Sequence, residues 1–150
     1  DGKNFSTDFD KDDKNFGYQP GMFSGNSLSK DKSNDPETII KLVKDDVKAL
    51  NKLGLKAVFK PISAEASPSK GNHKVALFVN ADPAGGGGAG YHWMRQDEDG
   101  LWSQKMGGRA ATNMINFQRV TDPRGINNPP FNKFVGFFEV GGFRNEKYEK

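Results

Sequence analysis

The sequence predicts a single α+β domain in which one main helix packs on a mostly antiparallel sheet and long loops surround both. Three observations support this class: one amphipathic segment with helical spacing, several short apolar runs after it, and a hairpin signal between two of those runs. The chain has 150 residues, enough for one well-buried core but not for two. We therefore expect residues 1–150 to form one domain.

The composition indicates a modest core beneath polar loops. Hydrophobic residues make up 34% of the chain, and mean hydropathy is −0.77. No apolar run approaches the roughly 18 residues that span a bilayer, so no membrane span is expected. The net charge of +3 is a mild excess rather than a concentrated basic stripe, and nucleic acid is therefore not an expected partner.

Residues 1–30 are expected to form an irregular N-terminal arm. The segment is rich in Asp, Asn, Lys, Ser and Gly, yet it carries more aromatic residues than a disordered tail. These rings are expected to hold the arm against the body or against a neighbouring molecule. The chain starts at Asp1 without methionine or a signal peptide, and a processed virion or extracellular protein is one interpretation of that start.

The segment 36–53 is predicted to be the main helix. Asp35 can cap its start and Pro36 suits its first turn, whereas Gly54 can end it in the left-handed conformation. The Lys and Asp residues between the apolar positions are expected on the outer face. Those apolar positions are Ile39, Ile40, Val43, Val47 and Leu50.

Short apolar runs after the helix are predicted to be strands. Asp97–Gly100 is a strong turn signal between two of them, and the resulting hairpin, residues 91–105, is expected to form the centre of the fold. A long stretch rich in Asn, Pro and Gly separates this hairpin from the last strand. The predicted strands are residues 55–60, 75–80, 91–96, 101–105 and 135–140.

Two sequence patterns resemble ligand-binding loops but are better explained without a ligand. The acidic segment 8–12 begins like a calcium loop, but Asp13 and Gln19 occupy positions that need glycine and glutamate. The glycines Gly85–Gly88 lead into a strand rather than a helix, which argues against a phosphate loop and favours a mobile loop beside a site. No cofactor and no metal are expected, because the chain has no cysteine and only two histidines.

His92 is the strongest candidate for a chemical role. It opens an apolar strand directly after the glycines, and a histidine there can project from the end of a sheet as a general base. His73 lies among polar residues and is expected to be exposed. Ser24 and Ser103 both lack the Gly-x-Ser-x-Gly flanks of a hydrolase nucleophile.

The C-terminal third allows a further alternative, a basic module that binds polyanions. Basic residues there are interleaved with phenylalanines, as in proteins that bind single-stranded nucleic acid. The simpler interpretation, that the phenylalanines pack inward and the basic residues solvate the loops, is favoured. The residues are Arg109, Arg119, Arg124, Lys133 and Arg144, with Phe117, Phe131, Phe134, Phe137 and Phe138.

Three stretches together resemble a poorly characterised family of bacterial and phage proteins. Residues 91–105 resemble its hairpin motif, which runs His-Trp-Tyr-Arg-Gln-Asp, a turn with glycine, and Trp-Ser-His-Lys-Pro-Gly. Residues 112–113 match a Thr-Asn that follows this motif. Weaker matches are Gln-Pro-Gly and Ser-Gly within residues 19–25 and the closing strand 134–140. The resemblance covers roughly half of the chain.

That family resembles a branch of the papain-like hydrolases, which include cell-wall amidases and peptidases. The resemblance implies an early cysteine, a histidine that opens a core strand, and a polar residue on the next strand that orients it. His92 takes the second position, and Gln104 takes the third, where the family has histidine. Asn4 stands where the cysteine belongs, and its amide nitrogen has no lone pair with which to act as a nucleophile.

The resemblance therefore implies a papain-like fold and argues against its activity. Trp93, Arg95, Trp102 and Asn113 belong to the same motif and are expected to contribute to binding. The favoured function is a non-catalytic structural or binding component of a larger assembly, with protein partners. The alternative is an active peptidase or amidase that uses His92 as base, the glutamine as orienting group, and a serine or water as nucleophile.

Overall fold

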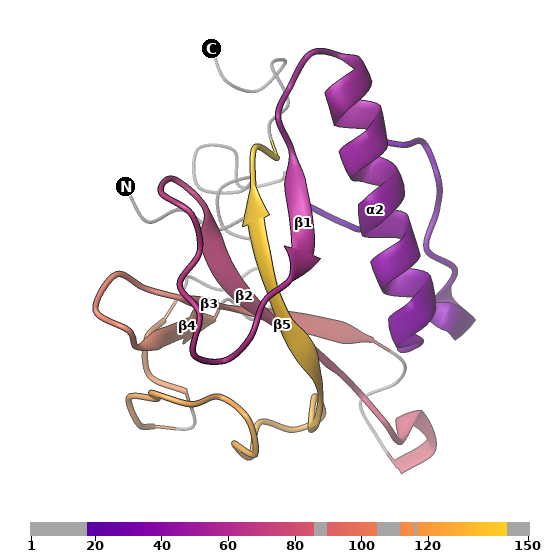
Figure 1. The fold of residues 1–150 in the computed structure, drawn as a ribbon. Coiled ribbons are helices and arrows are strands. Elements are labelled where there is room, and N and C mark those ends of the chain that lie inside the picture. The colour runs from indigo at the N-terminus through magenta and orange to yellow at the C-terminus, as the bar shows by residue number, and fades with distance from the viewer. Residues whose placement is uncertain (1–17, 86–89, 105–111, 116, 144–150) are drawn as a thin grey trace.

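The computed structural model describes residues 18–85, 90–104, 112–115 and 117–143 (Figure 1). One long helix, α2 (Pro36–Lys52), lies on one face of a five-stranded sheet in which neighbouring strands are antiparallel. The predicted α+β class, with one main helix on an antiparallel sheet, is therefore confirmed. None of the described helices is long and apolar enough to cross a membrane.

The last strand of the described residues, β5, is inserted between earlier ones. In space the strands follow the order β1-β5-β2-β3-β4, so β5 separates β1 from β2. Two short 3-10 helices, η1 (Lys30–Lys32) and η2 (Pro83–Gly85), lie in the connections. The strands are β1 (Val58–Pro61), β2 (His73–Val79), β3 (Tyr91–Gln96), β4 (Trp102–Gln104) and β5 (Lys133–Gly141).

The centre of the sheet is β2, and not the hairpin of β3 and β4. β2 pairs with β3 on one side and with β5 on the other, and six of its seven residues are buried. β4 pairs only with β3 among the described strands and forms an edge. The expectation that residues 91–105 form the centre is wrong, because the most apolar run takes the position that is covered on both faces.

Local signals in the sequence set the boundaries of α2. Pro36 occupies the first turn, and Gly54 adopts a φ of 90° just beyond the last one. Asp35 stands at the N-cap position, but its carboxylate accepts a hydrogen bond from the hydroxyl of Thr38 instead of from a backbone N–H. The expected side-chain cap is therefore replaced by a contact between side chains.

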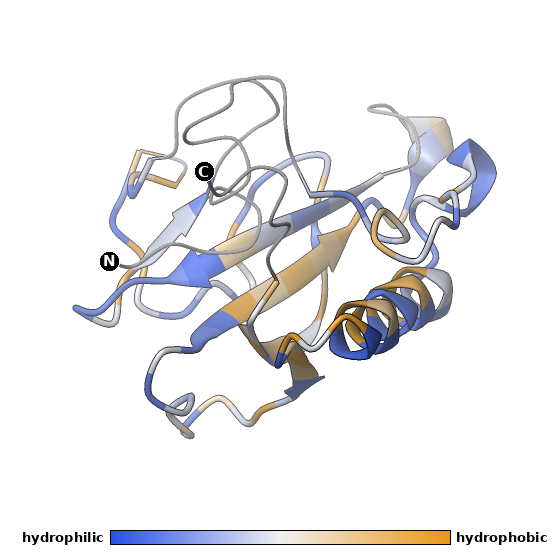
Figure 2. Ribbon diagram, turned by 90° about the horizontal axis from the view of Figure 1, so that it is seen from above, coloured by the Kyte–Doolittle hydropathy of each residue, from blue (hydrophilic) through white to orange (hydrophobic). Residues whose placement is uncertain are grey.

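The two faces of the sheet are covered differently. α2 lies on one face, which we call the helix side, where Ile39 and Val43 pack in one apolar cluster with Leu77 of β2. Figure 2 shows the hydrophobic strands of the sheet beside this helix. Loops cover the opposite face, which we call the loop side, where Ile115 and Val120 belong to a second apolar cluster. Both faces of the central strands are thus buried.

Asp46 of α2 points into the protein, so the expectation that the helix's aspartates lie on the outer face is wrong at this position. Its side chain is fully buried and accepts hydrogen bonds from the Tyr18 hydroxyl at 2.6 Å and from the backbone N–H groups of Gly21 and Ser24 at 2.8 Å each. These three donors hold residues 18–24 against the helix.

Candidate functional site

His92 lies on the loop side, near the start of β3. It stands opposite Phe78 of β2, and Met94, two residues further along β3, shares its face. Trp93, between them, packs on the helix side. The imidazole is largely buried, since only 7% of His92 is exposed. His92 therefore faces away from α2.

Gln104 of β4 is the polar partner of this histidine. The distance from His92 Nε2 to Gln104 Oε1 is 2.7 Å. Gln104 stands directly opposite Met94, so it lies diagonally across from His92 on the same face of the sheet. The structure thus brings together the two residues that the resemblance assigned to the base and its orienting group.

Asn128 joins this pair from a distant loop, and sequence reasoning missed it. Its Nδ2 donates a hydrogen bond of 2.9 Å to Gln104 Oε1, the same atom that contacts His92. The side chain is buried although Asn128 precedes two prolines in a turn-rich stretch. That context is typical of exposed loop residues, so the sequence contains no clear signal for this role.

Phe131 covers one face of the imidazole. The two rings stack with 5.2 Å between their centroids and 16° between their planes. A backbone hydrogen bond of 3.0 Å from Phe131 N to Asn128 O holds both residues in one turn. Gly90 leaves room for the ring, because a side chain there would come within 3.3 Å of it. We call His92, Gln104, Asn128 and Phe131 the His92 cluster.

The hydrogen bonds determine which nitrogen of neutral His92 carries the proton. Gln104 Oε1 can only accept, so His92 Nε2 donates and Nδ1 keeps its lone pair. Burial lowers the pKa of His92 below its ordinary value, and the hydrogen bond to Gln104 opposes this effect only in part. Near pH 7 the imidazole is therefore neutral, with Nδ1 as its basic atom.

Ser103 and Arg95 form a separate polar cluster on the helix side. Asp97 accepts hydrogen bonds from the guanidinium of Arg95 at 2.8 Å and from the hydroxyl of Ser103. Because neighbouring residues alternate along β4, Ser103 faces away from the side that holds Gln104. Its hydroxyl therefore does not reach His92.

The other nucleophile candidates do not lie beside the histidine either. Ser24 belongs to the segment that Asp46 holds on the helix side, and its hydroxyl donates to Gly21 O at 3.2 Å. Asn4, at the position implied for the nucleophile, lies outside the described residues. So does most of the glycine segment Gly85–Gly88.

The predicted binding residues do not form one surface with the His92 cluster. Trp93 and Arg95 point to the helix side, whereas Trp102 is buried on the loop side, where its indole N–H donates to the backbone oxygen of Thr121 at 3.2 Å. Asn113 is exposed on the loop between β4 and β5, whose described residues 112–115 and 117–132 we call the covering loop. Both tryptophans are at least 95% buried and are therefore core residues in this structure.

His73 and Phe117 depart from expectation. His73 is half-buried at the start of β2 rather than exposed, and burial together with the nearby Arg95 lowers its pKa. Phe137 and Phe138 pack inward as expected, but Phe117 is 94% exposed. The inward-packing interpretation therefore fails for that one phenylalanine.

Arg119 and Arg124, on the covering loop, have acidic neighbours, whereas Arg109 and Arg144 lie outside the described residues. Arg119 lies 3.1 Å from Asp99, and Arg124 lies 2.8 Å from Asp122. Within the described parts of the chain, no group of three or more His, Asp or Glu residues could hold a metal ion. Comparisons with protein-family models, curated proteins and solved structures find no match to this chain.

Proposed function

We propose that this chain is a non-catalytic, papain-like protein that serves as a structural or binding component of a larger assembly. The filled surroundings of His92 carry the proposal. Gln104 engages Nε2, Phe131 covers one ring face, and Asn128 ties the covering loop to the same glutamine. A general base needs a reacting atom within hydrogen-bond reach, and only 7% of His92 is exposed to an incoming molecule.

The positions of the candidate nucleophiles also support the proposal. The chain has no cysteine, and both described serines considered for this role, Ser24 and Ser103, lie on the helix side. In this proposal the His92 cluster acts structurally. It adds a side-chain connection between β4 and the loop that covers the second apolar cluster, beside the backbone hydrogen bonds that join them.

Turnover of peptides and peptidoglycan fragments tests the absence of catalysis. The wild-type chain and the His92→Ala variant are expected to give the same background rate from about pH 5 to about pH 9. His92→Gln serves as a second variant that keeps a polar group if the alanine variant fails to fold. Turnover by the wild-type chain that both substitutions abolish would contradict the proposal.

Size-exclusion chromatography and cryo-microscopy of the native source test the assembly role. The chain is expected to elute in a complex much larger than its own 16.5 kDa. A chain found only as a free monomer argues against the assembly role while leaving the turnover result unaffected, so the two parts of the proposal fail separately.

An active hydrolase is the second candidate, and one observation favours it. The neutral tautomer of His92 leaves Nδ1 as a basic atom, and the lowered pKa keeps that atom unprotonated near pH 7. In this alternative His92 removes a proton from water, because Ser103 and Ser24 are out of reach. The turnover comparison separates the two candidates, since only a hydrolase loses a measurable rate on substitution of His92.

A further inference from the structure

The exposed side of α2 is more basic than its sequence suggests. The helix contains four lysines and three acidic residues, which is close to balance. Asp46, however, is fully buried by its hydrogen bonds to residues 18–24, and Asp45 forms an ion pair of 2.9 Å with Lys41. Two of the three carboxylates are thus unavailable to the remaining lysines.

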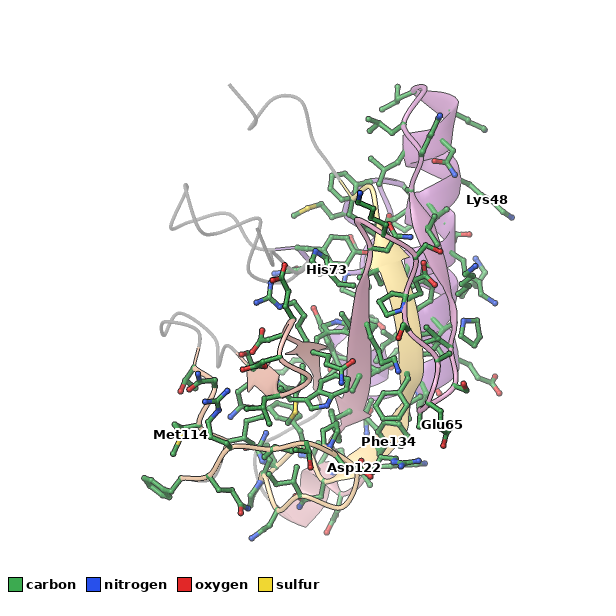
Figure 3. The ribbon with its side chains drawn as sticks, turned by 60° about the vertical axis from the view of Figure 1, so that its left-hand side comes forward. Lys48, Glu65, His73, Met114, Asp122 and Phe134 are labelled. Carbon is green, nitrogen blue, oxygen red and sulfur yellow. The ribbon has the colours of Figure 1, made fainter. Side chains whose placement is uncertain are left out.

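Lys44, Lys48 and Lys52, which we call the lysine row, lie on the exposed side of α2, where the third carboxylate, that of Glu37, is exposed in the first turn. Each is exposed, and none has an ion-pair partner among the residues that the structure describes. Their spacing of four residues places them along one side of the helix, about 6 Å apart along its axis. Figure 3 shows Lys48 on the side of α2 that points away from the sheet.

We propose that the lysine row binds a linear polyanion of the phosphodiester type, and this inference is independent of the His92 cluster. Ammonium groups repeated along a straight helix face match negative charges repeated along a flexible chain. Lysine suits such a chain because it contacts phosphate as a compact point charge without strict geometry. Each contact releases a condensed counterion, which favours binding at low salt.

A membrane surface fits this face less well. Helices that lie on a bilayer insert an apolar stripe beside their basic residues. The apolar stripe of α2, which includes Ile39, Val43 and Leu50, is buried against the sheet and is not available to lipid. The lysine row therefore offers positive charge but no apolar surface that could insert into a bilayer, which suits a phosphodiester chain better than a membrane.

Stabilisation of the helix itself does not account for the whole row. A positive charge in the last turn interacts favourably with the helix dipole, which explains Lys52. That effect falls off within one turn of the end, whereas Lys44 lies eight residues further back. A lysine in the middle of the helix gains little from the dipole, so the dipole does not explain the position of Lys44.

Titrations of the full-length chain test the proposal with two probes, a fluorescent single-stranded oligothymidylate and a poly(glycerol phosphate). Three lysine contacts predict a slope of about −2 for log K against log salt, so affinity falls about 20-fold between roughly 50 and 200 mM salt. Binding of both probes indicates recognition of the shared phosphodiester backbone. Binding of only one also supports the proposal and identifies the source of the polymer.

Two matched double variants distinguish binding by the lysine row from attraction by the net charge of the whole chain. Lys44→Gln with Lys48→Gln is expected to reduce the magnitude of the slope by about 1.4 and to weaken binding. Lys70→Gln with Lys133→Gln removes the same charge from exposed positions elsewhere and should leave the slope nearly unchanged. Glutamine and lysine have similar helix propensity, and circular dichroism checks that α2 remains folded.

Two results overturn the proposal. The first is the absence of salt-dependent binding to either probe at low salt. The second is an equal loss of affinity in both double variants, which would show that net charge and not the lysine row attracts the polymer. The His92→Gln variant should bind both probes as the wild-type chain does, so this test does not depend on the outcome of the turnover assay.

Discussion

At the scale of single residues, Phe117 combines an exposed side chain with a backbone conformation that usually belongs to glycine. Ile115 and Gln118 exchange backbone hydrogen bonds of 2.8 and 3.1 Å, and Phe117 directly precedes Gln118 in this bridge. The φ of Phe117 is 65° and its side chain is 94% exposed. A left-handed phenylalanine costs on the order of 1–2 kcal/mol, and burial of its ring does not offset that cost.

Replacing Phe117 by glycine should therefore stabilise the chain. We expect Phe117→Gly to raise the free energy of unfolding by about 0.5–1 kcal/mol, as measured by urea denaturation, because relief of strain exceeds the extra entropy of the unfolded glycine. Phe78→Ala is the contrasting control and should cost about 3–5 kcal/mol, because Phe78 is only 2% exposed. A loss of more than about 1 kcal/mol in Phe117→Gly would mean that the exposed ring stabilises the folded state.

At the scale of elements, the covering loop depends on a small number of contacts with the edge strand. Gln104 and Thr112 exchange backbone hydrogen bonds of 2.8 and 2.7 Å, and the backbone N–H of Trp102 donates to Val120 O at 3.0 Å. Asn128 adds the buried side-chain contact to Gln104. Since β4 has only three residues, these contacts determine whether the edge of the sheet and its cover open together.

Removal of the Asn128 amide should loosen this cover. Asn128→Ala leaves Gln104 Oε1 with one buried donor fewer, and a loss of about 1–2 kcal/mol in the free energy of unfolding is expected. Hydrogen exchange of the Thr112 and Ile115 amides should accelerate. The neighbouring Asn127 is exposed, so Asn127→Ala should change stability by less than about 0.5 kcal/mol. Equal effects in both variants would show that the His92 cluster does not hold the loop.

At the scale of the whole molecule, the two histidines make stability depend on pH. Burial lowers the pKa of His92 and of His73 in the folded state. Between the lowered and the ordinary pKa the unfolded chain binds more protons than the folded chain, so stability is lost as pH falls. The effect begins near the ordinary histidine pKa of about 6.5 and continues downward until the folded-state groups also protonate.

The free energy of unfolding should therefore decrease from about pH 7 to about pH 5, by at most about 1.4 kcal/mol per pH unit for each histidine. His92→Gln is expected to flatten this part of the profile, and His73→Gln should flatten it further. Urea denaturation at a series of pH values measures the effect. A profile that is level over this range, or that His92→Gln leaves equally steep, would rule out this origin of acid sensitivity.

The pairing of segments that are neighbours in the sequence could be predicted from local patterns, but contacts with distant segments could not. The hairpin signal at Asp97–Gly100 brings β3 and β4 together, and with them His92 and Gln104. Asn128 and Phe131 arrive from a loop whose path depends on the packing of Ile115 and Val120 against the sheet. No local pattern in the sequence encodes that path, so half of the His92 cluster could not be predicted.

The α+β class, the helix at Pro36–Lys52 and the approximate strands follow from the amino-acid order alone, because apolar periodicity, proline and glycine act locally. The central place of β2, the insertion of β5 beside it and the burial of Asp46 become visible only in the folded chain. These features depend on the competition of all apolar segments for the same core. For the same reason, a helix with nearly balanced charges presents an exposed row of lysines in the folded protein.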